Sequence, residues 1–176
     1  MKDWLKWLIL GVLSIVFGLF ALGNAVAASL AVTTVTGILF LVAGGFQVAA
    51  GWVQEGAGHK TLSIVLGLLM ILIGLSFVIN PLEGTISLAM LVTILIAASG
   101  ITRLIFAFRM KQTRYFWPML ISGAVSALLA GYIVANFGVA SISLLGILLG
   151  IELLFNGIGL TILAFFMKTN TTPPRR

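Results

Sequence analysis

Cysteine is absent from this chain of 176 residues, and charged residues are scarce. The lack of cysteine excludes disulfides, thiol catalysis and cysteine-ligated metal sites. The single histidine, His59, lies in a polar stretch, and the chain has no His-Glu metal motif, nucleophile elbow or phosphate-binding loop. We therefore expect a protein that is not an enzyme and that holds no cofactor and no metal ion.

Charged residues make up only 8% of the chain, whereas hydrophobic residues make up 61%. Soluble domains are about 25% charged, so this composition implies that lipid is the solvent. A membrane-spanning helix needs about 20 apolar residues. Six apolar runs approach or exceed this length: Trp4–Leu22, Ala27–Trp52, Leu62–Ile79, Thr85–Phe108, Phe116–Ala135 and Val139–Met167.

Helices are the expected form of these runs, because a membrane barrel needs alternating strands of about ten residues. The predicted fold class is an all-α membrane protein with six transmembrane helices. Residues 1–168 form a single transmembrane domain, and residues 169–176 form a short tail.

The basic residues orient the predicted helices in the membrane. All ten fall on one side: Lys2, Lys6, Lys60, Arg103, Arg109, Lys111, Arg114, Lys168, Arg175 and Arg176. The opposite loops, near Asn24, Pro81 and Asn136, contain no Lys or Arg. The positive-inside rule assigns the basic side, and with it both termini, to the cytoplasm. The net charge of +6 therefore reports topology and does not indicate nucleic acid binding.

An internal repeat of about 56 residues runs through the chain. Gly11, Gly67 and Gly123 keep this spacing, and so do the asparagines at 24, 80 and 136. The repeats 1–56, 57–112 and 113–168 each contain two helices, so they are three parallel helical hairpins. The repeat predicts a pseudo-threefold six-helix bundle. The alternative is three hairpins in a row that complete their packing in a homo-oligomer.

The repeat also bears on the start of the chain. Lys2, Lys6, the first apolar run and Ala25-Val26-Ala27 together resemble a cleavable signal peptide. The first helix belongs to the repeat, however, so we predict that it is a retained structural element.

The repeated glycines and asparagines are expected to serve helix packing and turn formation. Gly11 and Gly18 are seven residues apart, and Gly67 and Gly74 repeat this spacing, so each pair lies on one helix face. Small residues allow close helix packing in lipid. Asn24, Asn80-Pro81 and Asn136 are expected to form turns, because Asn tolerates left-handed backbone and can close a helix. The alternative is a ring of polar groups at the mouth of a pore.

Glu152 is the ionisable residue that the repeat does not explain, since its counterparts Leu39 and Leu95 are apolar. A carboxylate in a membrane span costs about 2.5–3.5 kcal/mol, so Glu152 should face the bundle interior. Asn156 lies one turn further on the same face. The two residues form either a hydrogen-bonded clamp between helices or a proton-responsive switch.

Arg103 is a candidate counter-ion for Glu152. The alternative is that its long side chain extends to the cytoplasmic interface. Gln47 occupies the same repeat position as Arg103, which indicates a shared polar level inside the bundle.

Four segments carry a resemblance to a known family: Gly67–Gly74, Ile79-Asn80-Pro81, Ser99-Gly100-Ile101 and Phe106-Ala107-Phe108. With them the chain resembles the HdeD family of bacterial inner-membrane proteins, which is also described by a short membrane repeat, DUF308. The resemblance implies six helices in the bacterial plasma membrane and an association with acid resistance. It supplies no catalytic residues.

The resemblance is looser in the first and third repeats, where Ala25 and Phe137 stand in place of the proline that follows Asn80. It favours a non-enzymatic membrane protein with a role in acid or general stress resistance. The alternative hypothesis is a small transporter or channel with Glu152 in its pathway and an unknown substrate.

Overall fold

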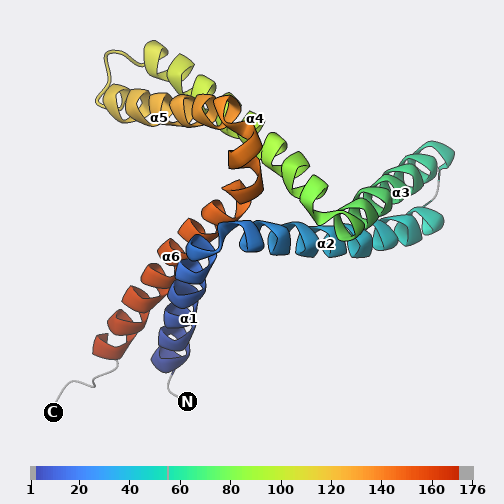
Figure 1. Ribbon diagram of the computed structural model, residues 1–176, viewed down its shortest axis with the longest axis horizontal. Helices are drawn as coiled ribbons and strands as arrows, with labels where there is room; N and C mark the ends of the chain where they lie inside the picture. Colours follow the sequence, from blue (N-terminus) through green and yellow to red (C-terminus); the bar gives the residue numbers. More distant parts are fainter. Residues whose placement is uncertain (1–2, 55, 171–176) are drawn as a thin grey trace. The chain divides into compact units, whose positions relative to one another are not determined.

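The computed structural model describes residues 3–54 and 56–170, and these residues form six α-helices and no strand (Figure 1). The helices are α1 (Asp3–Gly23), α2 (Ala25–Val53), α3 (Ala57–Ile79), α4 (Pro81–Arg109), α5 (Phe116–Ala135) and α6 (Phe137–Asn170). All six are long and apolar enough to cross a membrane, which confirms the six predicted spans. Lys2, Arg175, Arg176 and most of the predicted tail lie outside the described residues.

Two helices begin four or five residues before the apolar runs that predicted them. α3 starts at Ala57, ahead of Leu62, because helical hydrogen bonds continue through the polar turn after Gly56. Gly56 has φ 107°, a left-handed value that favours glycine, and is the one described residue with positive φ. α4 starts at Pro81, which fits there because the first turn of a helix needs no N–H donor.

A single asparagine joins the two helices of each repeat: Asn24, Asn80 and Asn136. Each backbone N–H donates to the carbonyl four residues earlier, and each carbonyl accepts from the amide four residues later, at 2.9–3.1 Å. The backbone is not left-handed as the sequence suggested, since Asn80 has φ −122° and Asn136 has φ −117°. Each asparagine therefore ends one helix and begins the next, and its φ angle stays negative.

The chain divides into two compact units, Met1–Ser29 with Ser143–Arg176 and Leu30–Ile142. In the first unit α1 packs against α6. A Cβ atom at Gly11 would lie 2.9 Å from the carbonyl oxygen of Gly157, and one at Gly18 would lie 2.9 Å from that of Gly150. The two helix backbones thus touch at two glycine pairs, as small-residue packing in lipid requires.

In the second unit α2 packs against α3, and α4 packs against α5 (Figure 1). Glycines again face each other across both contacts: Gly44 with Gly67, Gly37 with Gly74, and Gly100 with Gly123. Each glycine pair joins the second helix of one repeat to the first helix of the next. No repeat follows α6, and α6 packs against α1 of the first repeat instead.

Burial follows the repeat as well. Ala21, Phe77 and Ile133 are spaced by 56 residues, and all three are buried. Most large apolar side chains are instead exposed, among them Phe46 and Phe155, each 73% exposed. Small residues in the helix contacts and large apolar residues outside them suit a chain whose solvent is lipid.

Candidate functional site

Three buried hydroxyl groups occupy one position of the repeat. Ser29, Thr85 and Ser141 are spaced by 56 residues, and their exposed fractions are 0%, 0% and 1%. Each lies in the first turns of the second helix of its repeat, shortly after the asparagine joint. Sequence reasoning missed these residues, although the 56-residue spacing of hydroxyl side chains was the signal that could have identified them.

Thr85 belongs to a hydrogen-bonded joint in the second unit. Its Oγ1 atom lies 2.7 Å from Oγ1 of Thr33 on α2 and 2.8 Å from the carbonyl oxygen of Pro81. The Thr85 hydroxyl has one proton, and when that proton goes to Pro81 the Thr33 hydroxyl is the donor to Thr85. A Cβ at Gly84 would lie 2.8 Å from both the Phe77 ring and the Thr33 methyl group, so the joint has no spare room.

Ser29 makes the corresponding contact in the first unit. Its Oγ atom accepts a hydrogen bond of 2.7 Å from the backbone N–H of Gly146 on α6. Gly146 lies directly against the Ala25 carbonyl group, where no Cβ would fit. A glycine is therefore required for α6 to approach the start of α2 at this point.

Glu152 and Asn156, the predicted polar site, lie on α6 in the first unit, and both are exposed. The α1-facing side of α6 is marked by Gly150, Leu154 and Gly157. At about 100° per residue, Glu152 lies about 140–160° around the helix from both glycines. The carboxyl group is thus on the face of α6 that points away from α1.

Arg103 and Gln47 lie in the second unit, on α4 and α2. Arg103 is exposed, and its Cβ atom lies 3.1 Å from the position that a Cβ at Gly123 would take, so the base of the side chain packs at the α4–α5 contact. Gln47 is half-buried. Because Arg103 and Glu152 belong to different units, their pairing stays a prediction.

Each helix pair has a lysine over an aromatic ring, near the helix ends that are predicted to be cytoplasmic. The lysine Nζ lies 5.0–5.4 Å from the ring centroid in the pairs Lys168–Trp4, Lys60–Trp52 and Lys111–Phe108. Such contacts contribute about 0.5–1 kcal/mol at exposed sites. They hold aromatic rings and cations together at the level where both are favoured in membrane proteins.

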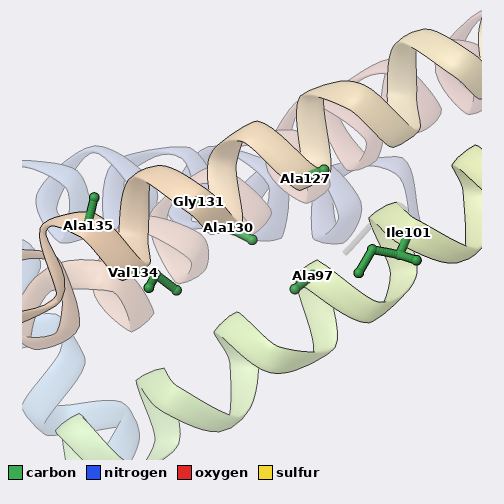
Figure 2. A pocket seen from close by; sticks show the side chains of 7 residues that line it. All are labelled: Ala97, Ile101, Ala127, Ala130, Gly131, Val134 and Ala135. Atoms are coloured by element: carbon green, nitrogen blue, oxygen red, sulfur yellow. The ribbon is translucent and has the colours of Figure 1, made fainter.

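An apolar groove of about 370 Å³ lies between α4 and α5 (Figure 2). It opens where this pair departs from the glycine pattern, because Thr93 and Ala130 stand at the repeat positions of Gly37 and Gly74. The lining consists of Ala97, Ile101, Ala127, Ala130, Gly131, Val134 and Ala135. None of these side chains carries a polar group, so only an apolar occupant would suit the groove.

No group of three or more His, Asp and Glu residues in the described part of the chain could hold a metal ion. The chemically distinctive groups are therefore the buried hydroxyls of the joints and the Glu152–Asn156 pair on α6.

The family described as "short repeat of unknown function (DUF308)" matches residues 9–79 and again residues 65–135. The two matches start and end 56 residues apart (65 − 9 and 135 − 79), which is the period of the repeat. Each match runs from a first helix to the end of the next first helix, so it contains one complete glycine-packed pair, α2 with α3 or α4 with α5.

Among curated proteins, the chain is similar to Protein HdeD of Escherichia coli K12, of Escherichia coli O157:H7 and of Shigella flexneri. In each case 25% of 155 aligned residues are identical, and the alignment covers 86% of this chain and 80% of the relative. No solved structure shows a significant match. From the two repeat matches and the six membrane-length helices, we conclude that the chain is a multi-pass membrane protein that belongs to the DUF308 family.

Proposed function

We propose that this chain is a non-enzymatic protein of the bacterial inner membrane that supports survival under acid or general stress. The observation that carries the proposal is the similarity to Protein HdeD, which extends over 86% of the chain. The resemblance to the HdeD family implies the acid role. The one-sided placement of the basic residues supports an orientation with both termini in the cytoplasm.

Glu152 is an ionisable residue within a membrane span that would carry part of this role. A carboxylate within a membrane span costs about 2.5–3.5 kcal/mol, and such residues commonly mark functional sites. Its position on the face of α6 away from α1 leaves it available to a partner outside that helix pair.

Acid survival of a deletion strain tests the proposal. The strain should lose survival at low pH and regain it with the wild-type chain, but not with Glu152→Gln, which cannot change charge. Leu39→Gln, at the repeat-equivalent position on α2, is the matched control and should complement. Equal acid survival with and without the wild-type chain would refute the stress role.

A transport function is the second candidate, and the exposed polar pair Glu152 and Asn156 within a membrane span favours it. Polar groups in spans commonly mark ion pathways. Reconstituted vesicles should then show a proton or solute flux that Glu152→Gln abolishes while the helical circular dichroism spectrum is unchanged. Identical fluxes in protein-free vesicles would exclude this candidate.

A further inference from the structure

The face of α6 that points away from α1 carries a second stripe suited to close packing. Glu152, Asn156 and Gly159 follow the i, i+4, i+7 spacing of one helix face. Glu152 and Asn156 are exposed, and a Cβ at Gly159 would meet nothing within 4 Å. α1 occupies the opposite face, at Gly150 and Gly157. α6 thus has two faces where a helix could dock, and α1 fills one of them.

α1 cannot satisfy the polar stripe. At the level of Glu152 it presents Ile15, Gly18 and Leu22 to α6, none of which carries a polar side chain. Among the described residues of α1 and α6, neither Glu152 nor Asn156 has a side-chain hydrogen-bonding partner. An unpaired carboxylate facing lipid is unfavourable, so the partner of this face comes from outside the unit.

We propose that the stripe Glu152–Asn156–Gly159 docks against the same stripe of a second copy of this chain. The stripe is self-complementary, because in a twofold contact residue i meets residue j and residue j meets residue i. The Asn156 amide can donate to the Glu152 carboxylate of the second copy, and the reverse contact forms at the same time. Gly159 lets the two α6 backbones approach closely.

The repeat supports a second copy as the occupant. Every glycine–glycine contact within the two units uses repeat-equivalent faces, such as Gly44 with Gly67 and Gly157 with Gly11. The stripe positions hold Leu39, Ala43 and Phe46 on α2, and Leu95, Ser99 and Thr102 on α4. Ser99 and Thr102 bond carbonyl groups of their own helix, so the carboxyl and amide pair occurs on α6 alone among the three second helices. A face found in only one of three repeats suits a contact between chains.

Single-cysteine cross-linking tests the contact directly, since the chain has no cysteine of its own. Phe155 lies beside the stripe and is 73% exposed, and its repeat counterpart Val42 on α2 is 52% exposed. Full-length Phe155→Cys, oxidised with copper phenanthroline in phospholipid vesicles at low protein density, should form mainly covalent dimers. The matched control Val42→Cys should give several-fold fewer.

Second substitutions in the Phe155→Cys background identify the groups responsible. Gly159→Leu should reduce the dimer yield strongly, whereas Gly45→Leu should not, although a Cβ at Gly45 also meets nothing within 4 Å. Glu152→Leu should weaken association about eightfold, the loss expected for the two reciprocal interhelical hydrogen bonds of about 0.6 kcal/mol each. Glu152→Gln should retain the dimer.

Equal cross-linking at Phe155 and Val42 would overturn the proposal, as would a dimer yield that neither Gly159→Leu nor Glu152→Leu reduces. If circular dichroism shows that Gly159→Leu does not fold, the dimer yield of Glu152→Leu alone tests the proposal. The association measurement does not involve acid survival, so its outcome is independent of the proposed stress role.

Discussion

The side-chain oxygens of Thr33 and Thr85 lie 2.7 Å apart in a fully buried joint between α2 and α4. Thr85 also bonds the carbonyl oxygen of Pro81, its own helix neighbour, at 2.8 Å. The two threonines therefore connect the second helices of successive repeats, next to the asparagine turn that begins α4. In an apolar solvent this is one of few polar contacts that can position one repeat against the next.

Thr85→Val should destabilise the protein by about 1–2 kcal/mol, because it leaves the buried Thr33 hydroxyl without this partner. The double variant Thr33→Val with Thr85→Val should recover part of the loss. Reversible unfolding in mixed detergent micelles measures the free energy of unfolding. Ser87→Ala is the control, since Ser87 is exposed and bonds its own helix at 2.9 Å. Equal effects of Thr85→Val and Ser87→Ala would show that the joint adds no stability.

Adjacent glycines on α2 should respond to alanine in opposite directions. A Cβ at Gly44 would lie 2.7 Å from the Gly67 carbonyl oxygen, whereas one at Gly45 meets nothing within 4 Å. Gly44→Ala should cost about 1–3 kcal/mol by forcing α2 and α3 apart. Gly45→Ala should be neutral or stabilise by up to about 1 kcal/mol through helix propensity. The same unfolding measurement compares them, and a similar loss in both would argue against the α2–α3 contact.

Gly146→Ala should destabilise the first unit by about 2–3 kcal/mol, because the new methyl group would meet the Ala25 backbone, which cannot move as a flexible side chain can. Gly138→Ala, also on α6, should be tolerated, since a Cβ there meets nothing within 4 Å. The proportion of folded protein after detergent extraction, followed by gel filtration, reports the difference. A normally folded Gly146→Ala variant would contradict the close approach of α6 to Ala25.

The orientation predicts which loops are accessible from outside the cell. A membrane-impermeant maleimide applied to intact cells should label Gly138→Cys, beside the Asn136 turn. It should not label His59→Cys until the cells are opened, because His59 lies on the side that carries the basic residues. Both positions are exposed, so burial does not confound the comparison. Labelling of His59→Cys in intact cells would reverse the proposed topology.

Much of the architecture follows from composition and periodicity alone. Continuous apolar runs predicted six membrane-length helices, and the structure confirms them. The 56-residue spacing of Gly11, Gly67 and Gly123 predicted the repeat, which the two DUF308 matches reproduce. These features can be predicted because a helix that crosses lipid needs a long apolar segment and backbone hydrogen bonds within that segment. Both requirements depend on the local sequence.

The pairing of the helices required the tertiary structure. A repeat of two helices is equally compatible with packing inside a hairpin and with packing between neighbouring hairpins, and only the contacts of Gly44 with Gly67 and of Gly11 with Gly157 select the second arrangement. The contact of Gly11 with Gly157 also places Glu152 on the face of α6 away from α1. Ser29 and Thr85 are buried by their own contacts, with Gly146 and with Thr33. The physical reason is that helix faces in lipid are distinguished by close approach of backbones, which depends on the partner helix as much as on the helix itself.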